Sequence, residues 1–547
     1  MILNVASHLD LLASAQPQRT ALITTIHQYQ HVDQEVVTFA ELADRTSFAA
    51  HFLQQTGIHR GMHVAVMIPP SLDFFVTTFA LFRIGAVPVL IDPGMGLKNL
   101  GKCLTEAMPE ALIGIPKAHI ARKLFRWAKR TIKITISTRK SWFARHFYPA
   151  FQKQSVANIP CIEPNSDEIA AILFTSGSTG VAKGVVYTHG MFANQVEMIK
   201  QLFGIEPGEV DLCTFPLFAL FGPALGMTSV IPDMNPTRPA EANPAKLVAE
   251  IREFGVSNMF GSPALLNTLS IYCEQRGIKL HTLRRIISAG APVSSRVLER
   301  MSKALAPDVE IFTPYGATES LPVACIGSLE ILEQTKALTE QGRGVCIGRP
   351  VPGMRVEIIP IHDEPQPGFR LDQVLPQDEI GEIVVNGPVV SQCYFGREQA
   401  NQLAKMQDDA GNCWHRMGDV GYFDAQGRLW FCGRKSHRVV LENRTLFTIP
   451  VEAVFNTHPK VFRTALVGIQ KNGTTIPVLC VELLKDFSYS VPLWSKVVSD
   501  LKDISLKFTH TAGVEHFLYH KGFPVDIRHN AKIFREKLAV WAARVLR

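Results

Sequence analysis

Patterns typical of short apolar strands alternate with patterns typical of amphipathic helices through the first 350 or so of the 547 residues. HVAVMIP (63–69) is typical of a strand, SLDFFVTTFALFRIG (71–85) has apolar residues at helical spacing and ends at a glycine, and AVPVLID (86–92) is again typical of a strand. This rhythm repeats further along, and it favours a mostly parallel sheet covered by helices. The sequence therefore predicts an α/β fold.

The pattern changes twice in the C-terminal third of the chain. From about 351 to 432 the helical periodicity fades, and RVEIIPI, GEIVVNG and GRLWFCG are typical of short strands in a smaller β unit. After GRKSHRVV a fresh α/β pattern begins, which predicts a C-terminal domain of roughly 110 residues. A chain of this length exceeds one typical domain, so several folded units are expected.

Hydrophobic segments do not indicate a membrane protein. The N-terminal MILNVASHLDLLASAQPQR lacks a basic start, so we expect the first helix of the fold there rather than a signal peptide. The longest uncharged stretch lies between Asp211 and Asp233, but its prolines and glycines would break a membrane helix. We expect a buried helix or pocket wall. The 10 cysteines are scattered, which fits a reducing cytoplasm.

One segment is strongly basic. No acidic residue lies between Glu110 and Glu163, and aromatic residues are interleaved with the cations. The positive residues are Lys117, Arg122, Lys123, Arg126, Lys129, Arg130, Lys133, Arg139, Lys140, Arg145 and Lys153. A solvated helix face explains such a run, and so does docking to an acidic partner or an anionic membrane. No recognition motif supports nucleic-acid binding.

A glycine-rich loop, LFTSGSTGVAKGV (173–185), follows the apolar run Ile169 to Phe174. Glycines let backbone N–H groups approach phosphate oxygens, hydroxyl side chains add donors, and Lys183 adds positive charge. The loop differs from a Walker A motif, because Ala182 precedes the lysine and Gly184 follows it. A flexible hairpin is the alternative explanation of the loop on its own.

Further motifs follow in the order TPYGATESLP (313–322), a Gly-Asp pair at 418–419 with Arg434 after it, and DIRHNAKIFREKL (526–538). With the glycine-rich loop, these motifs resemble the acyl-adenylate-forming (AMP-binding) superfamily of acyl-CoA synthetases, nonribosomal-peptide adenylation domains and luciferases. The resemblance covers nearly the whole chain. It implies a large N-terminal domain (1–435), with two α/β sheet subdomains and a small β unit, and a mobile C-terminal α/β domain (436–547) hinged at Ser436.

The resemblance also implies ATP and Mg²⁺ as cofactors and assigns a role to each motif. Thr318 contacts the α-phosphate, Glu319 is the Mg²⁺ ligand, Asp419 binds the ribose hydroxyls, Arg434 contacts the nucleotide, and Lys532 is the catalytic lysine. The residues implied to bind the β- and γ-phosphates of ATP are Thr175, Ser176, Gly177, Ser178, Thr179, Gly180 and Lys183. The adenine site comprises Gly290, Ala291 and Pro292 in the AGAP segment (289–292), together with Tyr315. Gly316 and Ala317 are also implied to bind the nucleotide. The chemistry fits, since Mg²⁺ and lysine offset the repulsion between a carboxylate and a phosphate.

Two departures from the superfamily pattern concern the acyl and thiol sites. Relatives often have a histidine in the acyl region, where this chain has Ala219. Large apolar neighbours suit a long hydrocarbon, although a packed wall has the same composition; the predicted pocket comprises Phe218, Ala219, Phe221 and Gly222. The loop LENRTLFTIPVEAVF lacks the glycine pair of relatives. Arg444, Leu446 and Phe447 fill it instead, which argues against ordinary thioester formation.

Three segments narrow the resemblance: the loop ILFTSGSTGVAKGV, the long stretch FPLFALFGPALGMTSVIPDMNPTRPA and the hinge GRKSHRV. By these segments the chain is most similar, within the superfamily, to the β-lactone-forming synthetases of bacterial long-chain olefin biosynthesis. This resemblance implies ATP-dependent adenylation of a 2-alkyl-3-hydroxy fatty acid, followed by attack of the 3-hydroxyl to give a β-lactone, AMP and pyrophosphate. It also implies assembly with other olefin-pathway enzymes, in the cytoplasm or at the inner-membrane surface. A long-chain fatty-acyl-CoA or fatty-acyl-carrier-protein ligase is the alternative. A non-catalytic scaffold would have lost Glu319, Asp419 or Lys532, and all are present.

Overall fold

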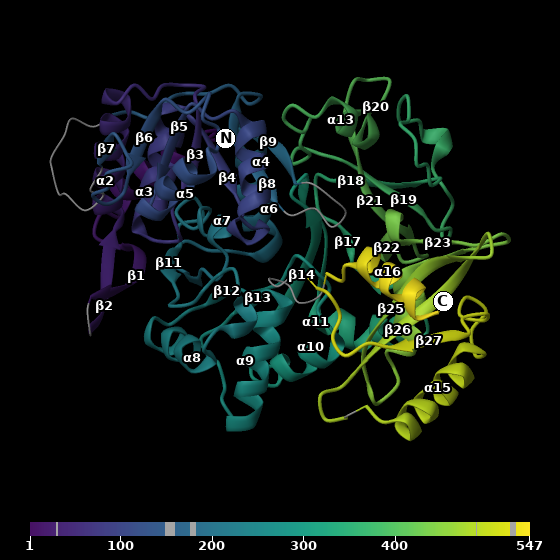
Figure 1. Ribbon diagram of the computed structural model, residues 1–547. Helices are drawn as coiled ribbons and strands as arrows, with labels where there is room; N and C mark the ends of the chain where they lie inside the picture. Colours follow the sequence, from purple (N-terminus) through teal and green to yellow (C-terminus); the bar gives the residue numbers. More distant parts are fainter. Residues whose placement is uncertain (29–30, 148–158, 176–181, 488, 526–531, 547) are drawn as a thin grey trace.

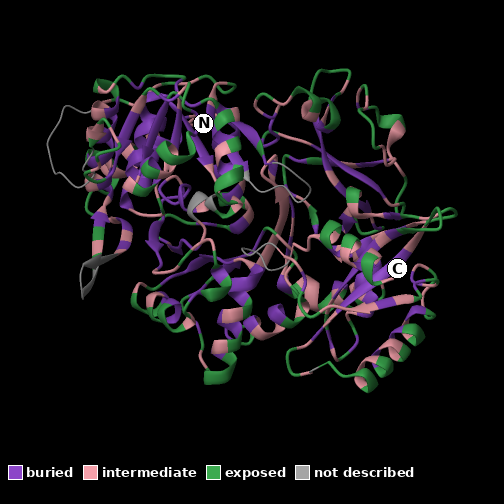
Figure 2. Ribbon diagram, viewed as in Figure 1, coloured by how far each residue is buried: buried purple, intermediate pink, exposed green. Residues whose placement is uncertain are grey.

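The computed structural model describes residues 1–28, 31–147, 159–175, 182–487, 489–525 and 532–546. Figure 1 shows the N-terminal half of the chain (purple to teal), with a mainly antiparallel β unit (green) and the C-terminal elements (yellow) beside it. The strands that form the interiors of these parts are mostly buried, and the outer helices turn exposed faces to solvent (Figure 2). The mixed α/β class predicted from the sequence is confirmed.

A seven-stranded sheet forms the first part, in the order β7-β6-β5-β3-β4-β8-β9. Its strands are β3 (His63–Met67), β4 (Val87–Ile91), β5 (Ala111–Gly114), β6 (Ile134–Ser137), β7 (His146–Phe147), β8 (Ile169–Thr175) and β9 (Lys183–Thr188). All neighbours are parallel except β8 and β9. Side chains alternate between the faces. Val64 and Val66 pack in the core with α2 (Phe39–Gln55) and α3 (Leu72–Ile84), and Ala65 packs with α4 (Leu97–Ala107).

The predicted helix at 71–85 is confirmed, and local chemistry explains its limits. The Ser71 side chain accepts a hydrogen bond from the backbone N–H of Phe74, which caps the first turn. Every residue of α3 is buried, including the charged Asp73 and Arg83, and most of its side chains are apolar, as expected for a helix inside the core. Gly85 ends the helix with φ 71°, a left-handed conformation that favours glycine. A Cβ there would also lie 2.5 Å from Ile162.

A nine-stranded sheet forms the second part, in the order β17-β15-β14-β13-β12-β10-β11-β1-β2. Its strands are β1 (Thr20–Gln28), β2 (His31–Thr38), β10 (Val210–Leu212), β11 (Thr228–Ile231), β12 (Asn258–Phe260), β13 (Arg285–Ile287), β14 (Glu310–Ala317), β15 (Ser320–Gly327) and β17 (Arg349–Pro350). The centre is parallel, and both edges are antiparallel. Helices α8 (Pro244–Glu253), α9 (Pro263–Arg276) and α10 (Ser295–Ser302) pack against this sheet in one hydrophobic core. Helices α1 (Val5–Ala15) and α6 (His189–Phe203) pack in a second core, which this sheet shares with the seven-stranded sheet.

The predicted smaller β unit is a six-stranded antiparallel sheet, β16-β22-β21-β19-β18 with β20 beside β21. Its strands are β16 (Val345–Cys346), β18 (Arg355–Ile359), β19 (Gly381–Asn386), β20 (Lys405–Gln407), β21 (Cys413–Phe423) and β22 (Leu429–Arg434). The C-terminal part has a three-stranded sheet, β25-β26-β27. It comprises α14 (Thr448–Phe455), β25 (Val461–Lys471), β26 (Thr474–Leu483), α15 (Val491–Ser505), β27 (His516–Tyr519) and α16 (Arg535–Val545). The boundary at 435/436 stays a prediction.

The uncharged stretch between Asp211 and Asp233 is divided into short elements. A single-turn helix, α7 (Pro216–Ala219), is followed by turns and then by β11. Most of its described side chains are buried, as expected for a pocket wall or core segment. Within the described ranges, no helix has both the length and the apolar character needed to cross a bilayer.

Candidate active site

One cavity of about 2190 Å³ collects residues from all parts of the chain. Its lining includes both aromatic side chains of the acyl prediction and most of the nucleotide prediction. The sequence-predicted residues on its wall are Lys183, Phe218, Phe221, Gly290, Ala291, Pro292, Tyr315, Gly316, Ala317, Thr318, Glu319, Asp419, Arg434, Ser436 and Lys532. Residues up to 349 positions apart in the sequence therefore share one site. Their individual roles stay predictions.

The glycine-rich loop is described only at its ends. Ser176, Gly177, Ser178, Thr179 and Gly180 lie outside the described residues, and Thr175 is placed only as the last residue of β8. Thr175 and Lys183 are register partners in the antiparallel pair β8/β9. The Lys183 Nζ lies 4.5 Å from the centre of the Tyr394 ring, and burial lowers the pKa of this lysine. Two antiparallel strands thus flank the loop, unlike the strand–loop–helix arrangement of a Walker A motif.

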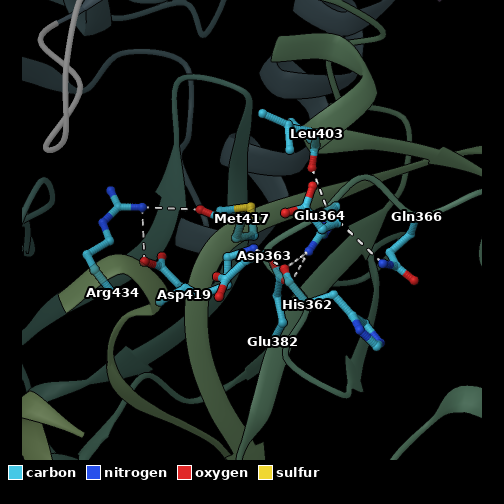
Figure 3. Close-up of polar contacts among 12 residues, drawn as sticks. His362, Asp363, Glu364, Gln366, Glu382, Leu403, Met417, Asp419 and Arg434 are labelled. Atoms are coloured by element: carbon cyan, nitrogen blue, oxygen red, sulfur yellow. Dashed lines mark hydrogen bonds and ion pairs between the residues drawn. The ribbon is translucent and has the colours of Figure 1, made fainter. Parts of the chain in front are cut away.

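A buried carboxylate forms the predicted ribose site. Arg434 Nη1 lies 3.0 Å from Asp419 Oδ1 (Figure 3). Tyr315 Oη donates to Asp419 Oδ2 at 2.6 Å. Asp419 and Arg434 are register partners on β21 and β22, so the sheet itself brings them together. Burial raises the pKa of Asp419, and Arg434, Tyr315 and the charge of Lys532 oppose that rise. Arg434 also donates to the Met417 carbonyl at 3.2 Å.

Two tyrosines hold the turn between β14 and β15. Tyr187 Oη donates to the Thr318 carbonyl at 2.6 Å, and Tyr394 Oη donates to Glu319 Oε1 at 2.6 Å. Each bond joins residues that are far apart in sequence. The turn therefore presents Thr318 and Glu319 to the cavity from a fixed backbone. Sequence reasoning missed both tyrosines, because no local pattern pairs them with this motif.

Lys532 reaches the cavity from the C-terminal part. The next residue, Ile533, pairs with Val525 in an isolated β-bridge, and Arg535 begins α16. Arg535 forms a bidentate ion pair with Glu452, with Nη2 2.6 Å from Oε2 and 2.8 Å from Oε1. The Leu466 N–H donates to Glu452 Oε1 at 2.8 Å, which ties the same carboxylate to β25. A buried ion pair therefore anchors the chain three residues after Lys532.

A second buried cluster lies beside the predicted hinge. Glu382 is paired with Arg416 at 2.7 Å and with Lys435 at 2.9 Å. Lys435 Nζ also donates to the His362 carbonyl at 2.7 Å, and Arg438 Nη2 lies 2.5 Å from Asp363 Oδ2. Figure 3 shows His362, Asp363 and Glu382 close to the Asp419–Arg434 pair. Ser436 lies between these two anchors, in the 3₁₀ turn Lys435–His437.

The four predicted acyl-pocket residues do not all face the cavity. Phe218 and Phe221 line it, and the Phe218 ring stacks on Phe260 with centroids 4.7 Å apart. Ala219 is buried in the hydrophobic core. A Cβ on Gly222 would lie 2.2 Å from Ser229 Oγ, so close packing explains this glycine. The aromatic wall is thus described by Phe218, Phe221 and Phe260, and sequence reasoning did not include Phe260.

The residues present fit ATP and a single Mg²⁺. Among the described residues, no group of three or more His, Cys, Asp or Glu side chains is arranged to hold a metal ion. Mg²⁺ in nucleotide sites needs only one or two carboxylates, because phosphates and waters supply the other ligands. Glu319, fixed by Tyr394 and facing the cavity, is a carboxylate of this kind.

Comparison with known proteins agrees with this geometry. The AMP-binding enzyme family model matches residues 9–395. An olefin β-lactone synthetase of Xanthomonas campestris pv. campestris is 46% identical over 99% of this chain and 98% of its own length. That of Stenotrophomonas maltophilia is 49% identical over 93% of this chain and 91% of its own length.

Solved structures give the same fold. The O-succinylbenzoate coenzyme A synthetase of Bacillus subtilis, in complex with ATP and a magnesium ion, superposes with a TM-score of 0.75 over 97% of this chain and 98% of that chain, at 22% identity. At that identity the likeness shows the fold alone. The family match and the two full-length relatives show more: the chain is an ATP-using, AMP-forming ligase of the AMP-binding enzyme family, and within that family it belongs with the olefin β-lactone synthetases.

Proposed function

We propose that the protein adenylates a long-chain 2-alkyl-3-hydroxy fatty acid and closes it to a β-lactone. The substrate carboxylate attacks the α-phosphorus of ATP, and pyrophosphate leaves. The 3-hydroxyl oxygen then attacks the acyl carbon, loses its proton and expels AMP. The observation that carries the proposal is near-full-length identity of 46% and 49% to two proteins named olefin β-lactone synthetase.

The cavity supplies groups for the first step. Asp419 has two carboxylate oxygens for the ribose hydroxyls, and Lys183 and Lys532 bring positive charge to the phosphates. Glu319 would hold Mg²⁺, which offsets the negative charge of the triphosphate when bound. Lys532 lines the same cavity and stabilises the charge that develops as the carboxylate meets the α-phosphate. We also propose 1–435 and 436–547 as separate domains hinged at Ser436.

The second step needs no external nucleophile. The hydroxyl and the acyl carbon belong to one molecule, so ring closure gains from proximity. The loop between Leu441 and Phe447 supports this reading over a thioester ligase. Arg444 Nη1 donates to the Thr509 carbonyl at 3.0 Å, and Nη2 donates to the Ala512 carbonyl. The bulky Arg444 side chain, bonded to a neighbouring segment, lies in a loop that glycines keep open in the superfamily.

The same proposal covers how the protein binds the acyl chain of its substrate and exchanges this insoluble compound with other enzymes. The aromatic wall at Phe218, Phe221 and Phe260 suits the hydrocarbon of a long acyl chain. Such an acid and its lactone are poorly soluble, so we propose assembly with the enzymes that supply the 3-hydroxy acid and consume the lactone. The protein would then work in the cytoplasm or at the inner face of the membrane.

The test is an incubation with ATP, Mg²⁺ and a 2-alkyl-3-hydroxy acid without any thiol, with the product identified by NMR. We expect β-lactone, AMP and pyrophosphate. The matched 2-alkyl acid without the 3-hydroxyl should release pyrophosphate in a single-turnover burst and then stall, because nothing closes the ring. Thioester formation on adding coenzyme A, with no lactone from the hydroxy acid, would overturn the proposal in favour of the acyl-CoA or acyl-carrier-protein ligase.

A further inference from the structure

Large apolar side chains are exposed along the basic segment. Trp142 is 100% exposed and Leu124 is 71% exposed, and Phe125, Phe143 and Phe147 are each exposed by more than a third. Ile120 and Leu124 are four residues apart on α5 (Pro116–Phe125), so they share one face of that helix. A soluble surface has scattered apolar residues, but a group of six such side chains within 28 residues indicates an interaction site.

Positive charge surrounds these side chains. Ten of the eleven basic residues of the segment lie within 116–147, and Lys153 lies outside the described residues. Across the described part of the chain, none of the ten forms a close ion pair with a carboxylate. Among them, the charge of Arg139 acts on the carboxyl of buried Asp73, where it opposes the rise in pKa that burial causes. Lys123 Nζ lies 5.1 Å from the centre of the Phe143 ring. We call the surface formed by residues 116–147 the basic face.

The basic face and the active-site cavity are formed by different residues. Trp127 packs in the core beneath α4 and α5, and Phe125 stacks on it with ring centroids 5.5 Å apart. A hollow of about 870 Å³ continues the surface toward α4, and its lining includes Lys98, Lys102 and Arg126. The ion pair between Glu106 and Arg397 also lines this hollow, and Arg397 lines the active-site cavity as well. Within the described ranges, no residue of 116–147 lines the active-site cavity.

We propose that the basic face docks the enzyme on an anionic lipid membrane. Lysines and arginines that form no close ion pair with a carboxylate match the negative surface of such a bilayer. Aromatic and aliphatic side chains among them match the boundary between headgroups and hydrocarbon, where tryptophan is favoured. A protein interface accounts for the five arginines and the aromatic side chains, but less well for the five lysines, a residue type that is depleted in the cores of such interfaces. The proposal concerns where the protein works and does not depend on the reaction it catalyses.

The experiment is co-sedimentation of the full chain with phosphatidylcholine vesicles that contain 0 or 40% phosphatidylglycerol, in 50 and 500 mM salt. We expect binding only to the anionic vesicles, weakened at least tenfold by the higher salt because screening shortens the reach of the charges. Changing Lys123, Arg126, Lys129 and Arg130 together to glutamine should reduce binding at least tenfold. The matched control changes four exposed lysines of the C-terminal part to glutamine, Lys471, Lys496, Lys502 and Lys507, and should bind as the wild type does.

Depth of insertion gives a second, independent readout. Brominated acyl chains should quench part of the tryptophan fluorescence of the wild type, and Trp142→Phe should remove that quenching while keeping the fold. ATP-dependent pyrophosphate release with a soluble short-chain acid should be unchanged in every variant, which shows that each is folded. Wild type that stays in the supernatant with anionic vesicles at 50 mM salt would overturn the membrane assignment. Equal loss of binding in the control quadruple variant would overturn it too, since net charge alone would then explain the binding.

Discussion

The two sides of the active-site cavity are built differently. On one side, Asp419 and Arg434 are cross-strand partners within one sheet, and Tyr315 completes their bonds. On the other side, Lys532 follows a segment outside the described residues and is anchored through Arg535 and Glu452. The bonded group of Asp419, Arg434 and Tyr315 is typical of a preformed binding site. Lys532, in contrast, brings its positive charge from a separate part of the chain. Nucleotide affinity and catalytic turnover should therefore be separable by mutation.

The largest effect is expected for Lys532→Ala. A lysine that acts mainly on the transition state lowers kcat more than it raises KM. We expect adenylation, measured by ATP–pyrophosphate exchange, to fall by about 10³-fold, with ATP affinity by calorimetry within about threefold of the wild type. Lys521→Ala, an exposed lysine nearby in sequence, is the control. Near-normal exchange in the Lys532 variant would remove this residue from the chemistry.

Asp419→Ala should have the opposite effect to Lys532→Ala: it should lower ATP affinity more than it lowers turnover. Hydrogen bonds to a charged group contribute about 1.5–3 kcal/mol each, so ATP affinity should fall by about 10- to 100-fold. Turnover at saturating ATP should change much less. Asp372→Ala, which removes an exposed carboxylate paired with Arg370, should leave affinity unchanged. Unaltered ATP binding by calorimetry in the Asp419 variant would show that this wall does not hold the nucleotide.

A tenfold loss of kcat is expected for Arg535→Met, because Lys532 loses the anchor that positions it. KM for ATP should stay within about twofold. The single variant also leaves Glu452 buried without its cation, and such orphaned charges cost about 3–5 kcal/mol of stability. The double variant Arg535→Met with Glu452→Gln removes that charge. If stability returns in the double variant but kcat does not, positioning is separated from folding; recovery of both would assign the pair a structural role alone.

The smallest effect is expected at His437. Burial, followed by the charges of Arg535 and Arg434, lowers the pKa of this imidazole to about 4, so it is neutral throughout the pH range 5.5–8. It gains charge only as the pH falls toward 4. A base of that pKa contributes little general-base catalysis near neutrality. His437→Gln should leave the pH profile of lactone formation between 5.5 and 8 unchanged, and loss of an ionisation in that range would contradict this.

Features fixed by nearby residues were predictable from the sequence. The helix at 71–85 has its serine cap and its glycine end within the predicted segment, and its limits were correct to one residue. Lys183, Tyr315, Glu319, Asp419 and Lys532 were found because each lies in a motif, and all line one cavity.

Features that depend on distant partners were missed. Tyr394 bonds Glu319 across 75 positions, and Glu382 pairs with Arg416 across 34. A charged residue on the inward face of an apolar strand, as in GEIVVNG, was the one available signal of that buried cluster. Ala219 and Gly222 were placed in the acyl pocket because core and pocket share one composition; close packing at Ser229 distinguishes the two only in three dimensions.

The two ion pairs that flank Ser436 differ in a way that bears on conformational equilibrium. Lys435 pairs with a fully buried carboxylate, whereas Arg438 pairs with Asp363, whose side chain is 66% exposed. If the chain turns at Ser436, the buried pair stays and the exposed pair breaks. An exposed pair contributes less than about 1 kcal/mol and is screened by salt. The Arg438–Asp363 pair therefore changes the ratio between the two orientations of the C-terminal part about Ser436 by at most about fivefold. Ionic strength changes this ratio without altering any active-site residue.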